Sequence, residues 1–244
     1  MKKLLENKNC VITGASGDIG ISCAKIFYSH GANLILLYNK NKKPIVKFQK
    51  QKKNILSYKC DLTNYKEIKK LVKNLNTKFS EINTLVNCSG VMENQNYFLD
   101  ENLKNLKKHL DLNSTGLIFL TKLLSRIMIR SNEPSIINIS SLAANYGIPS
   151  LSNYSASKGA VKSFTLSSAR ELGPLGIRVN SISPGIISTK LHNKSDLKKF
   201  KKNISLGRLG KPDEVAYVAL FLASFYSSYI NGQDLKVDGQ IKVF

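Results

Sequence analysis

The sequence of 244 residues predicts an α/β fold, a doubly wound parallel sheet of about seven strands with helices on both faces. Short apolar runs alternate with longer amphipathic ones, which is the pattern of repeated βαβ units. A glycine-rich turn separates the first apolar run from the first amphipathic one. No repeat, linker or break in composition divides the chain, so a single domain over residues 1–244 is expected.

Strands are expected at the short apolar runs, and helices at the longer amphipathic stretches between them. The strands, in chain order, are Cys10–Thr13, Asn33–Tyr38, Ile55–Tyr58, Thr84–Asn87, Ser135–Ser140, Arg178–Ile182 and Asp234–Val237. The helices are Asp18–Ser29, Tyr65–Phe79, Asn102–Met128 with a break near Asn113, Ser152–Leu172 and Pro212–Ala223. The polar stretch Thr189–Arg208 follows a strand and is expected to form a substrate lid or a plain surface insertion.

The chain is strongly basic, with 37 Lys and Arg against 16 Asp and Glu and a net charge of +21. This charge permits an acidic partner. Only five of the basic residues are Arg, and many Lys lie in polar stretches such as Lys40–Lys53 and Lys194–Lys202. Without Arg forks, aromatic stacking partners or a recognition module, the composition argues against nucleic-acid binding.

The cysteines and histidines do not form a metal-binding pattern. Cys10, Cys23, Cys60 and Cys88 contain no CxxC pair, and buried free thiols of a reducing compartment are expected. His30 and His109 are expected at helix ends or on the surface, with His192 a candidate lid residue. No apolar stretch approaches the roughly 20 residues of a membrane span, and no secretory leader is evident, so a cytoplasmic protein is predicted.

The glycine-rich turn predicts a Rossmann-like dinucleotide site. Glycines let the backbone approach a pyrophosphate, and the positive end of the following helix attracts it. The residues of this turn are Thr13, Gly14, Ala15, Ser16, Gly17, Asp18, Ile19 and Gly20. The second strand ends in Tyr38, Asn39 and Lys40 without an acid, and this favours NADP(H) over NAD(H) because an ammonium group attracts a 2′-phosphate.

Tyr154 and Lys158 lie four residues apart in an expected helix, so their side chains share one face. A lysine ammonium near a phenol favours the phenolate and lowers a pKa that starts near 10, so Tyr154 is predicted to exchange protons near neutral pH. Ser141 follows the fifth strand and is positioned to hydrogen-bond a substrate carbonyl at the carboxyl edge of the sheet.

Together with Asn113 and the segment Asn87-Cys88-Ser89-Gly90, these motifs resemble the short-chain dehydrogenase/reductase family over nearly the whole chain. The resemblance implies a catalytic tetrad of Asn113, Ser141, Tyr154 and Lys158. In it, Tyr154 protonates a ketone oxygen as NADPH delivers hydride, Ser141 orients the carbonyl, and Lys158 also binds the nicotinamide ribose. Asn113 would hold a water that passes protons to Lys158.

The resemblance also implies the remaining cofactor contacts. These are Asp61 with Leu62 at the adenine, Asn87, Cys88, Ser89 and Gly90, and then Pro184, Gly185, Ile187 and Thr189 at the nicotinamide carboxamide. The chain departs from the family pattern at Asp18, which replaces the middle glycine of the turn, with a glycine at Gly17 instead. An inward carboxylate would repel phosphate, whereas one at a helix start favours the helix.

Within the family, Leu206–Ala216 and the ending Tyr229–Gly239 look most like 3-oxoacyl-[acyl-carrier-protein] reductases of fatty acid biosynthesis. Arg126 and Arg130 are then candidate docking groups for the acidic carrier protein, and a homotetramer through the last helix and strand is implied. Another NAD(P)-dependent oxidoreductase of a small ketone, sugar or alcohol is the alternative, because loops such as Met92–Asp100 and His192–Lys202 set the substrate. A non-catalytic nucleotide-binding scaffold is the more remote one.

Overall fold

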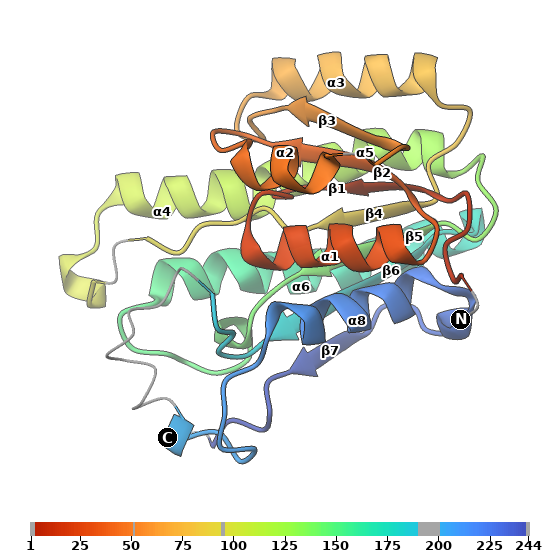
Figure 1. Cartoon of the computed structure of the whole chain (residues 1–244). Coiled ribbons are helices and arrows are strands. Elements are labelled where there is room, and N and C mark those ends of the chain that lie inside the picture. The colour runs from red at the N-terminus through yellow and green to blue at the C-terminus, as the bar shows by residue number, and fades with distance from the viewer. Residues whose placement is uncertain (1–2, 51, 94–95, 190–200, 243–244) are drawn as a thin grey trace.

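The computed structural model describes residues 3–50, 52–93, 96–189 and 201–242. Its centre is a seven-stranded parallel sheet in the order β3-β2-β1-β4-β5-β6-β7 (Figure 1). The strands are β1 (Asn9–Ile12), β2 (Asn33–Tyr38), β3 (Ile55–Lys59), β4 (Thr84–Asn87), β5 (Ser135–Ile139), β6 (Arg178–Pro184) and β7 (Asp234–Val237). The predicted sheet is confirmed, and each strand end lies within two residues of its expected position.

Helices cover both faces of the sheet (Figure 1). One core lies under α1 (Asp18–Ser29), α2 (Lys43–Gln49) and α8 (Pro212–Ala223), and the other under α3 (Tyr65–Lys78), α5 (Gly116–Met128) and α6 (Ser152–Leu172). Alternate strand residues supply the two cores, as Ile12 and Val11 of β1 show. This division follows from the two-residue period of a strand.

The stretch predicted as one broken helix forms α4 (Leu103–Leu110), a π-helical turn at Asp111–Thr115 and then α5. The expected break near Asn113 is therefore confirmed. Helix α2 was not predicted from the sequence, because its lysine-rich composition resembles a solvated loop. Only Ile45 and Phe48 of its seven residues are buried, and these two side chains hold it on the core of α1.

The four cysteines are free thiols, and three of them are buried while Cys88 is half-buried. Burial raises the pKa of Cys10 to about 12 and that of Cys60 to about 11, because it disfavours the thiolate. Across the described part of the chain, no helix combines the length and apolar character of a membrane span.

Candidate active site

The glycine-rich turn lies where β1 and β4 are neighbours and the chain leaves them toward opposite edges of the sheet. Such a switch point opens a crevice at the carboxyl ends of the strands. Thr13 fixes the crevice, because its backbone N–H donates to Val86 O at 2.9 Å and its Oγ1 accepts from the N–H groups of Cys88 and Ser89, each at 3.0 Å. The turn is thereby joined to the segment that follows β4.

Two glycines in the turn cannot be replaced without moving the backbone. A Cβ on Gly14, which has a φ of 58°, would lie 2.9 Å from Cys88 and Ser89 backbone atoms. A Cβ on Gly20 would lie 2.3 Å from Gly14 O. Because these contacts are with backbone rather than flexible side chains, the turn has the close packing that a dinucleotide cradle needs.

The other residues of the turn lie at the start of α1. Gly17 is the N-cap, its N–H donates to Gly14 O at 2.9 Å, and Asp18 begins the helix. Ser16, which precedes Gly17, and Ile19, which follows Asp18, are both half-buried. A carboxylate in the first turn is favoured by the helix dipole, which accounts for Asp18 in this position without any loss of helix stability.

The end of β2 faces an acid from the next strand connection. Burial alone would raise the pKa of Asp61, but hydrogen bonds from Thr63 and Asn39 and the charge of Lys40 outweigh it and lower that pKa. Tyr38 lies alongside, with the Lys42 ammonium 5.8 Å from its ring centroid. The sequence correctly shows no acid within the end of β2, yet the fold brings a carboxylate there. The end of β2 therefore offers both a carboxylate, which suits a ribose 2′-hydroxyl, and the Lys40 ammonium, which suits a 2′-phosphate.

The segment after β4 divides into a part that faces the core and a part that faces the tetrad. The buried Asn87 amide donates to Thr121 Oγ1 at 3.0 Å and to Asn138 Oδ1 at 2.9 Å, so this side chain braces α5 and β5. Gly90 lies against the tetrad, since a Cβ there would be 3.2 Å from Lys158 Nζ and 3.3 Å from Asn113 Oδ1.

Asn113 lies in the π-helical turn and is fully buried. Its Oδ1 accepts from Val91 N at 2.8 Å, and its Nδ2 donates to Val91 O and Ser157 Oγ, both at 3.0 Å. Both amide hydrogens are therefore used within the protein. The side chain joins the segment after β4 to α6, so a bound water would have to contact an oxygen of Asn113.

The other three tetrad residues meet at the carboxyl edge of β5. Ser141 hydrogen-bonds Tyr154, and the buried Lys158 donates from Nζ to Ile139 O at 2.8 Å. Burial lowers the pKa of Lys158 to about 8, with the Cys88 charge acting against it. Burial raises the pKa of Tyr154, and Ser141 only partly offsets that effect. The prediction that Lys158 lowers the tyrosine pKa is therefore wrong for the protein groups alone, because desolvation of the phenol dominates.

The segment after β6 completes this edge of the sheet. Pro184 ends the strand, Gly185 N donates to Val237 O at 2.9 Å, and a Cβ on Gly185 would be 2.7 Å from Asp238 Cα. Ile187 is buried and forms a bridge with Gly210, and Thr189 is the last described residue before the gap.

Most of the expected lid, including His192, lies outside the described residues. Its described end is attached to the C-terminal segment, because Ser205 N donates to Gln240 O at 2.9 Å and Lys242 N to Asn203 O at 2.8 Å.

Leu62, which was expected near the adenine, is buried, and its carbonyl oxygen would be 2.2 Å from a Cβ on Gly116.

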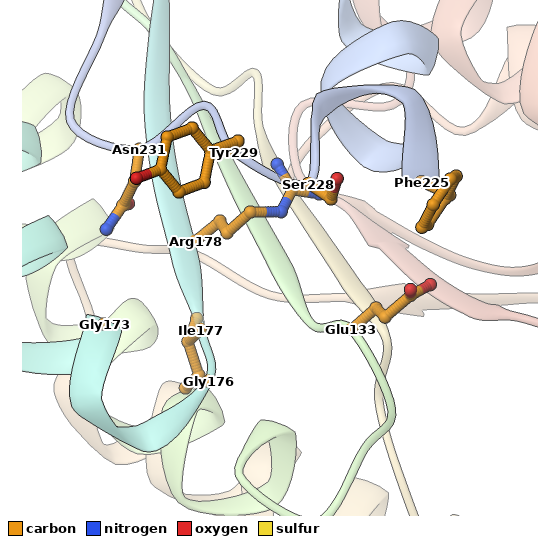
Figure 2. Close-up of a pocket in the computed structure, with 9 residues that line it drawn as sticks. All are labelled: Glu133, Gly173, Gly176, Ile177, Arg178, Phe225, Ser228, Tyr229 and Asn231. Atoms are coloured by element: carbon orange, nitrogen blue, oxygen red, sulfur yellow. The ribbon is translucent and has the colours of Figure 1, made fainter.

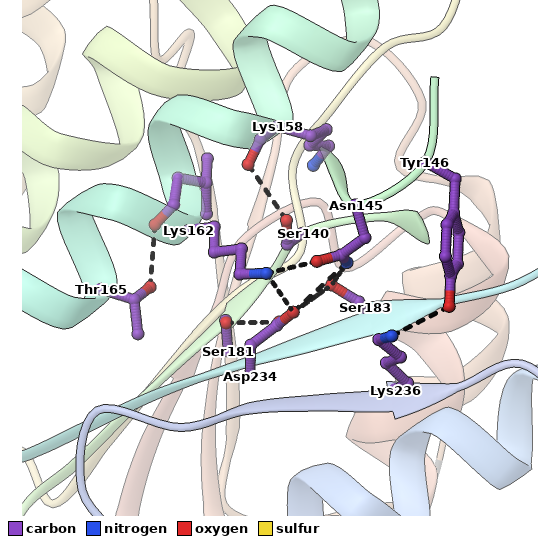
Figure 3. A network of polar contacts seen from close by, with 11 residues as sticks. Ser140, Asn145, Tyr146, Lys158, Lys162, Thr165, Ser181, Ser183, Asp234 and Lys236 are labelled. Carbon is purple, nitrogen blue, oxygen red and sulfur yellow. Dashed lines mark hydrogen bonds and ion pairs between the residues drawn. The ribbon is translucent and has the colours of Figure 1, made fainter. Parts of the chain in front are cut away.

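A polar network that the sequence analysis missed joins β6, β7, α6 and the loop after β5 (Figure 3). The Asp234 carboxylate of β7 accepts from Ser181 Oγ at 2.6 Å and Ser183 Oγ at 2.8 Å, both on β6, and pairs with Lys162 of α6 at 3.6 Å. Asn145, in the loop after Ser141, donates to the same carboxylate at 3.4 Å and accepts from Lys162. Two serines on one face of a strand are the only sequence signal for this network.

The structure also gives positions to Arg126, Arg130 and His109. Arg126 and Arg130 lie at the carboxyl end of α5, which runs antiparallel to the strands, so they face the edge opposite Tyr154; Arg130 donates there to Asn76 Oδ1 at 2.7 Å. A carrier protein docked on them would not lie over the same subunit's tetrad.

His109 was expected at a helix end or on the surface. It is at the end of α4, but buried.

A cavity of about 490 Å³ also lies at the start of β6, at that opposite edge (Figure 2). It is lined by Glu133, Gly173, Gly176, Ile177, Arg178, Phe225, Ser228, Tyr229 and Asn231. The Arg178 guanidinium donates to Ser227 Oγ at 2.9 Å and Leu222 O at 3.0 Å, so it fastens the end of α8 to β6. None of the predicted site residues lines this cavity.

Comparison with known proteins finds a matching family and relatives of similar sequence. The family described as enoyl-(acyl carrier protein) reductase matches residues 14–240. A 3-oxoacyl-[acyl-carrier-protein] reductase from Thermotoga maritima is 35% identical, with 98% of this chain and 99% of that protein covered. A 3alpha-hydroxysteroid dehydrogenase from Mediterraneibacter gnavus is 32% identical, with 98% of each chain covered.

Solved structures give the same fold. A short-chain dehydrogenase/reductase from Brucella melitensis superposes with a TM-score of 0.91 at 32% identity, with 98% of each chain covered. Aldohexose dehydrogenase from Thermoplasma acidophilum gives 0.88 at 30% identity, with 98% of this chain and 95% of that one covered. With the match over residues 14–240, these full-length similarities show that the chain belongs to the short-chain dehydrogenase/reductase family of oxidoreductases.

Proposed function

We propose that the protein reduces 3-oxoacyl thioesters carried on acyl carrier protein to 3-hydroxyacyl thioesters, with NADPH, in fatty acid biosynthesis. The observation that carries this proposal is the meeting of Ser141, Tyr154 and Lys158 beside the glycine-rich turn at one sheet edge. The relative from Thermotoga maritima, named as a reductase of this substrate class, supports the choice of substrate.

NADPH, when bound, supplies the hydride, and the chain supplies orientation and a proton. Ser141 Oγ donates a hydrogen bond to the substrate carbonyl, and Tyr154 donates its phenolic proton to the oxygen as negative charge develops. A phenol with the ordinary pKa near 10 already carries its proton at neutral pH, and burial raises the pKa of Tyr154 further in that direction. The Lys158 ammonium is held by Ile139 O and would contribute positive charge to the ribose of a bound cofactor.

The chain offers a fitting cradle for the cofactor. Gly14 and Gly20 pack closely against backbone and carry no Cβ, so at these two positions no side chain blocks the approach of a pyrophosphate to the start of α1, where it is favoured. Asn39, Lys40 and Asp61 would hold the adenosine end, with Lys40 at a 2′-phosphate. The whole of residues 1–244 would act as one NADP(H)-binding domain.

A second candidate is the oxidation or reduction of a small ketone, sugar or alcohol. The steroid and aldohexose dehydrogenases among the similar proteins favour it, because they use the same fold at comparable identity. A non-catalytic nucleotide-binding scaffold is the third candidate, and the complete set of Ser141, Tyr154 and Lys158 argues against it.

The test is NADPH oxidation followed at 340 nm with the purified protein. We expect fast oxidation with an acetoacetyl thioester on acyl carrier protein, and a rate at least about tenfold lower with NADH, since Lys40 favours a 2′-phosphate. Activity on free ketones or sugars alone would favour the second candidate. No oxidation with any substrate, despite measured NADPH binding, would favour the scaffold.

We also propose a cytoplasmic homotetramer, in which α8 and β7 meet their counterparts in a second subunit. Tyr217 and Phe221 of α8 are 58% and 37% exposed, and β7 is an edge strand whose far side has no partner strand among the described residues. Light scattering should give four times the 27.1 kDa of one chain. Tyr217→Lys should give smaller species, and a wild-type monomer would refute the proposal.

A further inference from the structure

His109 is a buried side chain that the proposed chemistry does not use. It is 2% exposed, on the α4 turn immediately before the π-helical turn that holds Asn113. The imidazole ring meets the Tyr154 ring edge to face, with the centroids 6.3 Å apart and the planes at 75°. This arrangement is a favoured one for two aromatic rings.

Hydrogen bonds fix the orientation of this ring. His109 Nδ1 lies 2.9 Å from Asn105 O, and since a carbonyl only accepts, Nδ1 carries the hydrogen. Nε2 of the neutral ring is then an acceptor, and the Glu93 N–H approaches it at 3.4 Å. The imidazole is therefore held from its own helix and from the segment that follows β4.

Two further contacts fasten the surroundings of Tyr154. The Glu93 carboxylate forms an ion pair with Lys108 on α4, and Asn153, next to Tyr154 on α6, donates to Glu101. These contacts anchor the segment that precedes α4 to α4 itself and to α6, and the His109 ring cannot move away from the phenol without breaking its own hydrogen bonds.

We propose that His109 is a positioning residue for Tyr154, with its imidazole ring holding the phenol in line with Ser141. The proposal rests on the proposed function, in which Tyr154 is the proton donor. Displacement of a catalytic group by about 1 Å can cost about a hundredfold in rate, so loss of the ring should lower kcat rather than weaken cofactor binding.

The test compares two replacements of similar apolar character. His109→Phe keeps an aromatic ring against Tyr154 and loses both hydrogen bonds, whereas His109→Leu loses the ring as well. We expect kcat to fall at least about tenfold for His109→Leu, with the KM for NADPH and its binding constant unchanged, and to stay within about threefold of wild type for His109→Phe. His30→Leu, at the distant end of α1, is the matched control and should leave kcat unchanged.

Circular dichroism and melting temperature establish that each variant is folded. If His109→Leu does not fold, His109→Met fills similar space without a ring and is measured in its place. A ring-free variant with wild-type kcat overturns the proposal, and so does a folded His109→Phe as slow as the ring-free variant. Failure of the proposed function is distinguished by Tyr154→Phe, which would then retain turnover.

Discussion

Tyr154→Phe should lower kcat by about two to four orders of magnitude, the usual contribution of a positioned proton donor. The change removes one oxygen from a half-buried side chain and leaves the ring that contacts His109. Ser141 and Lys158 keep their other partners, Ala143 N and Ile139 O. NADPH binding should therefore change little. Steady-state kinetics and a fluorescence titration with NADPH would measure the two quantities separately.

Tyr65→Phe is the matched control for this experiment. Tyr65 is 43% exposed at the start of α3, and its ring packs edge to face on Phe119 with the centroids 5.1 Å apart. The substitution removes the same oxygen far from the tetrad, so kcat should equal that of the wild type. Turnover by Tyr154→Phe within about threefold of wild type would remove Tyr154 from the mechanism.

Gly116→Ala should destabilise the fold by about 2 kcal/mol or more, although alanine is the better helix former. Gly116 begins α5 against the loop after β3, where a Cβ would lie 2.2 Å from Leu62 O and 2.9 Å from Leu62 C. Because the obstacle is backbone, α5 or the loop must shift. Asp61 precedes Leu62, so NADPH affinity should fall as well. Urea unfolding at fixed protein concentration and an NADPH titration would measure both effects.

Gly159→Ala, also in a helix, should have the opposite effect and stabilise the fold. Gly159 lies within α6, and a Cβ there would meet nothing within 4 Å. The substitution should stabilise the protein by about 0.5 to 1 kcal/mol, because alanine loses less backbone entropy and shields the helix. Equal stability changes for Gly116→Ala and Gly159→Ala would mean that the Leu62 contact has no energetic cost.

The features that could be predicted from sequence are those set by local periodicity. Helices α1 and α6 and strand β4 begin and end at the expected residues, because their apolar patterns stop at clear polar or glycine boundaries. The spacing of Tyr154 and Lys158 likewise placed both on one helix. Short α2 gave no comparable signal, because two buried side chains among lysines define no period.

Interactions between distant segments could not be predicted in this way. Asn87 and its partner Asn138 are separated by 51 residues, and Asp61 meets Asn39 only because β2 and β3 end side by side. A histidine in an amphipathic helix is expected to be polar and exposed, and only tertiary packing places His109 against Tyr154. The pKa of Tyr154 has the same origin, since burial is a property of the whole fold.

The Asp234 carboxylate couples local opening of the sheet edge to the active-site loop. An edge strand held on one side by backbone bonds alone would exchange its amide hydrogens through local fraying. Here the Asp234 side chain of β7 is only 11% exposed and accepts from Ser181, Ser183 and Lys162. Separation of β7 from β6 would therefore break all three of these contacts. Asn145 is bound to the same carboxylate, so the loop after Ser141 and strand β7 should open together as one cooperative unit.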